Sequence, residues 1–255
     1  MSIITLSAKA YNNFQLKFVD KLLKAMLRDL KVETQIHKFS HGWIQIAISG
    51  EDEKAALHYL AGEIGFGPKH LENLERFSTV KGYITSLSRK ELYIDMGVFS
   101  SNIVNAVVSL KSLQAQLADG RKMSLEKIAE LFGFVENLPF TVKILKVDLE
   151  KSYVEAVLSE KQLDLYRRWA KSLLDRLVVL GASFNRVEAA LKRTSCNRDV
   201  VNIETLGLFE NAVVCKLGTD AVGLIPKIGR RLWKADFSIF NPKKIVDFLG
   251  DYLIS

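Results

Sequence analysis

The stretch VKGYITSLSRKELYIDMGV, residues 80–98, decides how the fold is predicted. Apolar and polar residues alternate through 80–86 and again through 91–98, which is typical of β-strands with one buried face. Ser88, Arg89 and Lys90 lie between the two runs and supply a polar turn. The stretch therefore predicts a β-hairpin.

More strand patterns follow this hairpin. An apolar run covers 104–110, and two further strand patterns cover 140–148 and 153–158. Residues 112–134 show helical spacing in two pieces, and Ser124 is placed to cap the second piece. These patterns predict a β-rich domain with a helical insert over residues 79–160.

The residues before the hairpin predict a smaller α+β layer. Its expected order is strand, helix, two strands and helix, over residues 3–10, about 14–30, 32–39, 43–49 and about 51–64. The acidic residues at 51–53 suit the N-terminus of the second helix, and Gly65 suits its end. This order predicts a split βαβ (ferredoxin-like) domain over residues 1–78.

The last third of the chain mixes helices and strands. An amphipathic pattern predicts a helix over about 160–180, and a second helix is expected at 185–192. Strand patterns then cover 200–204, 212–217, 222–225 and 235–240. We therefore expect a helical segment leading into a second β module over residues 161–255, and an α+β fold class for the whole chain.

Positive charge is concentrated in that last third. The net charge of +7 comes from 36 basic and 29 acidic residues. Residues 161–255 hold 16 of the basic and 10 of the acidic residues, and eight of the 16 are arginines, whose planar fork suits phosphates. An uneven basic surface of this kind indicates a polyanionic partner such as RNA, and a solvated surface is the alternative.

Composition excludes several classes of protein. The chain is 48% hydrophobic and 25% charged, as globular proteins are. Its longest uncharged run, residues 96–110, is too short to cross a bilayer. The first 20 residues show no signal-peptide pattern, and there are two cysteines, Cys196 and Cys215. We expect a soluble cytoplasmic protein without a membrane partner.

The central region resembles the ribosomal S-one type of OB fold. The residues that carry the resemblance are 80–84 and 91–98, together with 140–148 and 154–159. A weaker match at 206–209, 213–218 and 223–226 is similar to the first three strands of the same fold, which implies a second, partial OB-like module. The combination of all three modules resembles an archaeal protein family, and this second resemblance supplies no activity.

The S-one resemblance implies RNA binding on one barrel face, through stacking aromatics and cations. Tyr93 occupies the position of a stacking aromatic, whereas Lys90 and Ser109 stand where the family commonly has an aromatic and a histidine. Alternation places Lys81 and Tyr83 on the face opposite Ile84. The candidate nucleic-acid-binding residues of the barrel are Lys81, Tyr83, Lys90 and Tyr93, with a rim position as the alternative for Tyr93.

A second candidate site lies near the C-terminus. Lys227, Arg230, Arg231 and Lys234 follow a predicted strand, and four cations in so short a loop could grip phosphates. Trp233 lies among them, and we expect it to pack in the core rather than to stack on a base.

An amphipathic helix carries another set of cations. We expect a solvated face there, with pairing of Asp164 to Arg168 and of Lys171 to Asp175 at helical spacing. The cations of this face are Arg167, Arg168, Lys171 and Arg176.

Signatures of catalysis are missing from the sequence. Gly218 and Gly223 have the spacing of a phosphate-binding loop, but Leu224 and Ile225 stand where lysine and serine or threonine are needed. The four histidines are scattered over one domain without ligand spacing. We therefore predict no catalytic residue, no metal and no cofactor.

Two functions fit these observations. The first is a non-enzymatic RNA-binding or ribonucleoprotein-associated protein of the translation or RNA-processing machinery. The second is a protein-interaction adaptor on a ribosome or RNA polymerase, without direct RNA contact. An enzyme acting on RNA or nucleotides fits less well because the sequence offers it no site.

Overall fold

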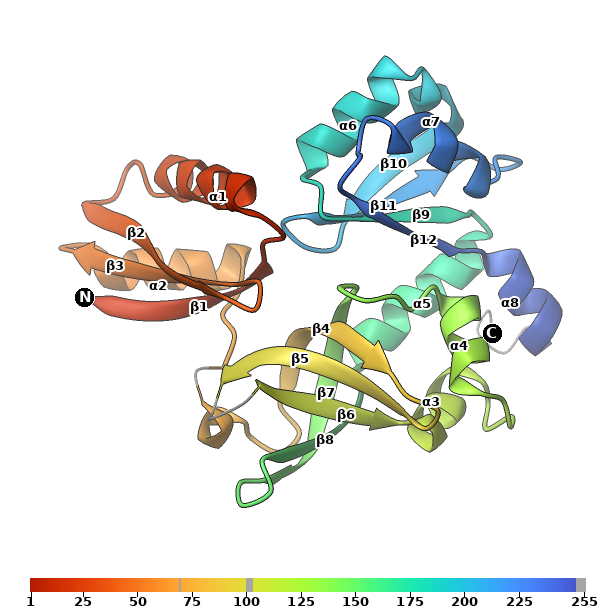
Figure 1. Ribbon diagram of the computed structural model, residues 1–255, viewed down its shortest axis with the longest axis horizontal. Coiled ribbons are helices and arrows are strands. Elements are labelled where there is room, and N and C mark those ends of the chain that lie inside the picture. The colour runs from red at the N-terminus through yellow and green to blue at the C-terminus, as the bar shows by residue number, and fades with distance from the viewer. Residues whose placement is uncertain (69, 100–102, 251–255) are drawn as a thin grey trace.

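A computed structural model describes residues 1–68, 70–99 and 103–250 (Figure 1). Three sheets are arranged around a common junction: an N-terminal sheet, a central barrel and a C-terminal sheet. A mixed α+β architecture with a barrel at residues 79–158 agrees with the sequence prediction.

The N-terminal sheet has three antiparallel strands in the order β1-β3-β2. Its strands and helices are β1 (Ser2–Lys9), α1 (Asn13–Met26), β2 (Val32–Ser40), β3 (Trp43–Gly50) and α2 (Glu53–Glu63). Asn12 caps the N-terminus of α1, because its side chain accepts a hydrogen bond from the amide of Gln15 at 3.1 Å. A short 3-10 turn, Leu71–Asn73, then leads to the barrel.

The barrel closes in the order β4-β5-β6-β8-β7, with β7 pairing back onto β4. Its strands are β4 (Thr79–Leu87), β5 (Glu91–Phe99), β6 (Ile103–Ser109), β7 (Pro139–Asp148) and β8 (Tyr153–Leu158). Strands β6 and β8 are parallel, and the other neighbouring strands are antiparallel.

The predicted two-piece helical insert lies between β6 and β7. It consists of α3 (Leu110–Leu117) and α4 (Leu125–Phe132). Ser124 caps α4, accepting from the amide of Lys127 at 3.2 Å.

The C-terminal sheet has four antiparallel strands in the order β10-β11-β9-β12. Its strands and helices are α5 (Glu160–Ser172), β9 (Arg176–Leu180), α6 (Phe184–Arg193), β10 (Val200–Thr205), β11 (Glu210–Cys215), α7 (Ile225–Gly229), β12 (Asp236–Phe240) and α8 (Pro242–Leu249). Two 3-10 turns, Cys196–Asp199 and Val222–Leu224, complete it.

This open sheet corrects the expected second OB-like module. Residues 206–209 form the turn between β10 and β11, and residues 223–226 are helical, so two of the three matched segments are not strands. The strand expected at 222–225 is also helical. The match came from apolar residues and glycines that also suit turns and caps. The region is an open sheet covered by helices, not a partial barrel.

The helix expected over 160–180 is also corrected. It ends at Ser172, because Leu173 adopts a left-handed conformation with φ of 53°. Residues 176–180 form the central strand β9, which is buried throughout. A short apolar run of this kind fits a buried strand as well as a helix, so periodicity could not separate the two.

The barrel and the C-terminal sheet share one hydrophobic core. Helix α5 lies between them (Figure 1) and contributes Tyr166 and Trp169. The Tyr166 ring stacks on Phe240 of β12 at 5.8 Å, and its edge meets Phe132 of α4 at 5.3 Å. The other face of the sheet is covered by α6 and α7, whose apolar residues form a separate cluster.

Candidate nucleic-acid interface

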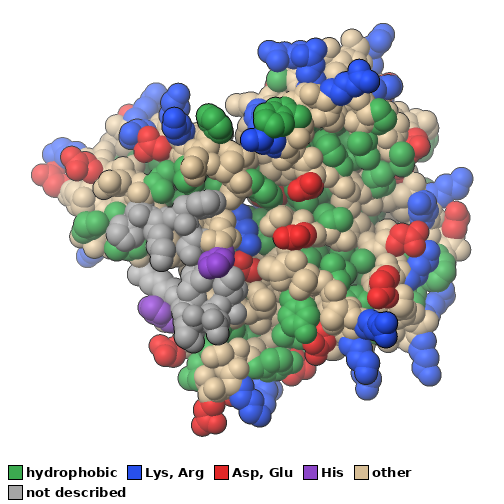
Figure 2. Space-filling view, viewed as in Figure 1, with side chains coloured by type: hydrophobic (Ala, Val, Ile, Leu, Met, Phe, Trp, Pro, Cys, Tyr) green, Lys and Arg blue, Asp and Glu red, His purple; other side chains and the backbone are tan. Residues whose placement is uncertain are grey.

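The predicted basic loop is a short helix and turn, residues 225–234, on the outside of the C-terminal sheet. Ile228 and Leu232 are buried against the sheet, one helical turn apart, and the residues between them face outward. The cations Lys227, Arg230, Arg231 and Lys234 are all exposed. Lysine and arginine side chains crowd the surface over α6 and α7 (Figure 2). Among the described residues, no carboxylate forms an ion pair with these four cations.

Trp233 is exposed, which corrects the expectation that it packs in the core. Its side chain is 71% accessible, and the Lys234 ammonium lies 4.4 Å from the ring centroid. Leu224, Ile228 and Leu232 form the apolar row that anchors this segment, and Trp233 falls one position off that row. That spacing was the sequence signal that could have identified an exposed tryptophan. The segment 227–234 therefore presents an aromatic ring beside four cations that form no ion pair with a described carboxylate, as nucleic-acid-binding surfaces do.

The four barrel candidates are split between two places. Six residues of β4, about 20 Å of extended strand, separate Lys81 from Leu87 beside the turn that holds Lys90. Tyr83 is fully buried, because the N-terminal sheet covers this part of the barrel, which corrects its expected place on an exposed face. Lys81 is half-buried, and its ammonium donates to the Leu206 carbonyl at 2.9 Å.

Tyr93 and Lys90 lie at the far end of the β4–β5 hairpin. Lys90 is exposed and Tyr93 is half-buried, a rim position. The Tyr93 hydroxyl donates to Glu91 at 2.6 Å, which raises the pKa of the tyrosine. Val107 pairs with Tyr93 on one side and with Glu155 on the other, so a second carboxylate lies on the same row of the barrel. The negative charges of Glu91 and Glu155 repel a phosphate group that approaches Tyr93.

A buried polar cluster that sequence reasoning missed joins the N-terminal sheet to the barrel. The Lys9 ammonium of β1 and the Asp95 carboxylate of β5 are 2.7 Å apart, and both side chains are at least nine-tenths buried. The Trp43 indole also donates to Asp95, at 2.8 Å. The Lys9 ammonium lies 5.5 and 5.4 Å from the rings of Trp43 and Tyr83. Gly97 is required here, because a Cβ would come within 2.9 Å of the Trp43 ring.

Glu210 of β11 occupies the junction of all three sheets. It is fully buried, and its carboxylate accepts a hydrogen bond from the Tyr11 hydroxyl at 2.8 Å. Burial raises the pKa of Glu210 to about 7, against the opposing effects of the Tyr11 hydrogen bond and the Lys81 charge. Burial also raises the pKa of Tyr11 and lowers that of Lys81. The junction therefore contains a carboxyl group that titrates near neutral pH.

Replacing Glu210 with glutamine is expected to change how stability depends on pH. The carboxyl has a pKa of about 4.3 in unfolded chains and about 7 in the folded protein, so the folded state binds its proton more tightly. Its stabilising contribution is complete below the unfolded value and is lost as the pH rises through the folded value. The unfolding free energy of wild type relative to Glu210→Gln should fall by about 3 kcal/mol between about pH 4 and about pH 8, measured by urea unfolding. The exposed Glu136→Gln variant is the control, and its unfolding free energy relative to wild type should not change with pH. If the difference between wild type and Glu210→Gln is equally independent of pH, the raised pKa of Glu210 is contradicted.

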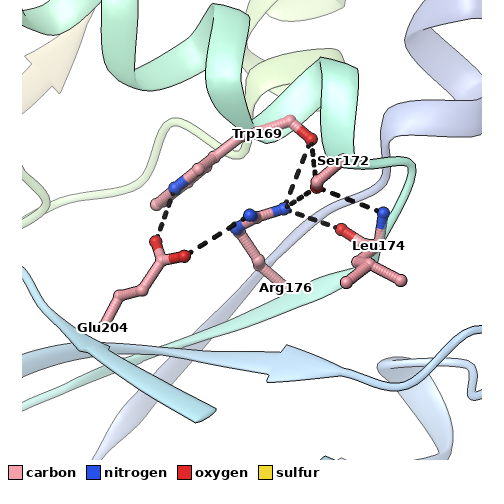
Figure 3. A network of polar contacts seen from close by, with 5 residues as sticks. All are labelled: Trp169, Ser172, Leu174, Arg176 and Glu204. Atoms are coloured by element: carbon pink, nitrogen blue, oxygen red, sulfur yellow. Dashed lines mark hydrogen bonds and ion pairs between the residues drawn. The ribbon is translucent and has the colours of Figure 1, made fainter. Parts of the chain in front are cut away.

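Arg176 is buried, which corrects its expected place on a solvated helix face. Its guanidinium lies 5.1 Å from the Trp169 ring, and its NH1 donates to Ser172 and Leu174 at 2.9 Å (Figure 3). Glu204 of β10 lies 3.4 Å from Arg176 and accepts from the Trp169 indole at 2.7 Å (Figure 3). This network fastens the end of α5 to β9 and β10, so Arg176 contributes no surface charge.

The expected pairing on α5 is also different. Asp164 pairs with Arg167 at 2.9 Å, not with Arg168, and Arg167 is also 3.6 Å from Glu160. Asp175 lies outside the helix and accepts from the side chain of Asn241 at 3.3 Å, so it does not form the expected pair with Lys171. Arg168 therefore remains exposed without a described carboxylate partner.

Family models match consecutive parts of the chain. They are described as the DUF2110 N-terminal, central and C-terminal domains and match residues 3–68, 74–170 and 174–240. The chain belongs to the DUF2110 family. A search of curated protein sequences gave no match. Within residues 1–68, 70–99 and 103–250, no helix is long and apolar enough to cross a membrane.

Solved structures resemble the chain only weakly. A chain of the a/eIF2alpha–aDim2p–rRNA complex from Pyrococcus horikoshii OT3 is 11% identical, with a TM-score of 0.27, over 48% of this chain and 64% of that one. The intact alpha subunit of aIF2 from Pyrococcus abyssi is 10% identical, with a TM-score of 0.27, over 66% of this chain and 97% of the other. An uncharacterized protein from Methanocaldococcus jannaschii is 14% identical, with a TM-score of 0.24, over 34% and 95%.

Proposed function

We propose that this DUF2110 protein is a non-enzymatic RNA-binding or ribonucleoprotein-associated protein of the translation or RNA-processing machinery in the cytoplasm. Segment 227–234 is its principal contact with single-stranded RNA. The observation that carries the proposal is the exposed Trp233 ring beside Lys234, with Lys227, Arg230 and Arg231 exposed around it. Stacking on an aromatic face and neutralisation of phosphates together form a typical surface for single strands.

The architecture supports this proposal. Strand order β4-β5-β6-β8-β7, with parallel β6 and β8 and a helical insert before β7, is the arrangement we assign as an OB fold. In each open sheet a helix connects two strands that lie on either side of a third strand, as in split βαβ units. Helix α1 connects β1 to β2 on either side of β3, and α6 connects β9 to β10 on either side of β11. The second candidate function, a protein-interaction adaptor on a ribosome or RNA polymerase, is favoured by the carboxylates around Tyr93.

Replacing Trp233 with alanine is expected to weaken RNA binding by roughly 1–3 kcal/mol, the value of one stacking contact, with an unchanged salt dependence. Trp233→Phe keeps an aromatic face and should retain most of the affinity. Binding is measured by fluorescence anisotropy of a labelled single-stranded RNA. Trp43 and Trp169 are buried, so RNA should quench the emission of Trp233 alone. If Trp233→Ala binds RNA as tightly as the wild type, and RNA does not quench the tryptophan emission of the wild type, the adaptor function is favoured.

A further inference from the structure

Phe77 is an exposed aromatic residue held in an uncommon backbone conformation. The residue is 55% accessible, and its φ of 68° lies in the left-handed region that bulky side chains rarely adopt. The Phe77 amide donates to the Ile144 carbonyl at 2.7 Å, and the Ser78 hydroxyl donates to the Glu75 carbonyl at 2.6 Å. These bonds hold the ring at the surface, next to the start of β4. A left-handed backbone conformation costs free energy in a bulky residue. Strained conformations of this kind cluster at functional sites.

Two cations lie against the Phe77 ring. The Arg76 guanidinium is 4.6 Å from the ring centroid and the Lys143 ammonium is 5.4 Å from it. The Arg76 side chain is fixed by a hydrogen bond to the Leu145 carbonyl at 3.1 Å. This arrangement of an exposed ring beside cations repeats the one at Trp233 and Lys234.

A cationic groove adjoins Phe77 on the β4–β7 side of the barrel. Two hollows of about 450 and 250 Å³ share Lys81, Thr141 and Lys161, and Arg168 lines the smaller one. Thr79 pairs with Lys143, and Lys81 pairs with Thr141, so the groove follows the same two strands away from Phe77. Among the described residues that line the two hollows, none is an aspartate or glutamate.

Within the described part of the chain, no surface carboxylate forms an ion pair with the cations of this groove. Arg167 is neutralised by Asp164 and Glu160, whereas neither Lys161 nor Arg168 forms an ion pair with a described carboxylate. Burial lowers the pKa of Lys81, and the nearby charge of Lys161 lowers it further, while the buried Glu210 opposes both. Positive charges gathered in a groove without surface carboxylates attract a polyanion.

From this geometry we propose a second single-stranded RNA contact, in which one base stacks on Phe77 and the adjoining phosphates lie along Lys143, Lys161, Lys81 and Arg168. This proposal rests on the RNA-binding function proposed above and adds a site on a different surface. It lies on the β4–β7 side of the barrel, not on β5 beside Tyr93.

The first test replaces Phe77 with glycine, which adopts a φ of 68° without steric cost, so that the variant is expected to fold. Affinity for a labelled oligouridylate of about 12 nucleotides should fall at least about 5-fold, with an unchanged salt slope. Phe77→Trp should bind as the wild type does. Unchanged affinity in a folded Phe77→Gly variant would overturn the stacking contact.

The second test removes two groove charges in the variant Lys161→Gln/Arg168→Gln. The slope of log affinity against log salt should become shallower by about 1.4, or about 0.7 for each lost phosphate contact. The control Arg167→Gln/Lys171→Gln removes the same charge from other exposed positions of α5 and should change the slope less. Equal slopes in the two variants would overturn the groove.

The two RNA contacts can fail separately. Trp233→Ala is measured on the same oligonucleotide, together with Phe77→Gly. Loss of affinity in Trp233→Ala alone supports the segment 227–234 and overturns the stacking contact at Phe77. Loss of affinity in Phe77→Gly alone supports the stacking contact at Phe77 and overturns segment 227–234 as the principal contact. A wild type that does not bind the oligonucleotide overturns both contacts.

Discussion

Replacing Lys227, Arg230, Arg231 and Lys234 together with glutamine is expected to lower RNA affinity roughly 100- to 1,000-fold at about 0.1 M salt. Each phosphate contact that is lost no longer releases a counter-ion, so the salt slope should become shallower by about 0.7 per contact, or about 2.8 in total. The loss should be similar for every RNA sequence, because phosphate contacts carry no sequence information.

The fold of this fourfold variant should be unaffected. All four side chains are exposed, and the residues that anchor the segment, Ile228 and Leu232, remain in place. Circular dichroism and urea unfolding check this point. A matched control replaces four exposed lysines elsewhere with glutamine, namely Lys17, Lys21, Lys54 and Lys111. If both fourfold variants lose the same affinity and the same slope, RNA responds to the overall charge and the segment makes no direct contact.

The barrel could be predicted from sequence because its information is local. Alternation and turn residues within 80–98 set both strands of the first hairpin, and the later strands follow the same pattern. Strand β9 could not be assigned in this way. Its apolar residues are buried on both faces, so they show no alternation, and they follow directly on the apolar stripe of α5.

The candidate site was only partly predictable, because burial depends on contacts between distant segments. The alternation that placed Lys81 and Tyr83 on one face was informative, but the N-terminal sheet covers that face at Tyr83. The cations of segment 227–234 are exposed, as a run of charged residues predicts without distant information, but they follow a 3-10 turn and a short helix instead of the predicted strand and loop. Lys9, Asp95 and Glu210 come from three separate regions of the chain, so no local pattern could bring them together.

Breaking the buried pair of Lys9 and Asp95 is expected to cost about 3–5 kcal/mol of stability. Asp95→Asn keeps the shape of the side chain but leaves the Lys9 ammonium without a counter-charge in a site where its side chain is 8% accessible. Lys9→Met leaves the Asp95 carboxylate with only its hydrogen bonds from Trp43 and Gly97. Because the pair joins β1 to β5, both variants should also loosen the N-terminal sheet from the barrel, which faster proteolysis near residues 67–78 would show.

The exposed pair of Lys24 and Asp20 is a control that separates the effect of burial on stability from the effect of the distance between the charges. Its charged atoms are 2.8 Å apart, against 2.7 Å for Lys9 and Asp95, but the Lys24 side chain is 65% accessible. Lys24→Met should therefore cost only about 0.3–0.5 kcal/mol in the same urea titration. The double variant Lys9→Met/Asp95→Asn should cost less than the sum of its two single variants, since it leaves no unpaired charge buried. If Asp95→Asn costs no more than Lys24→Met, the junction does not depend on this ion pair, and packing of Trp43 on Gly97 and Tyr83 must hold the two sheets together.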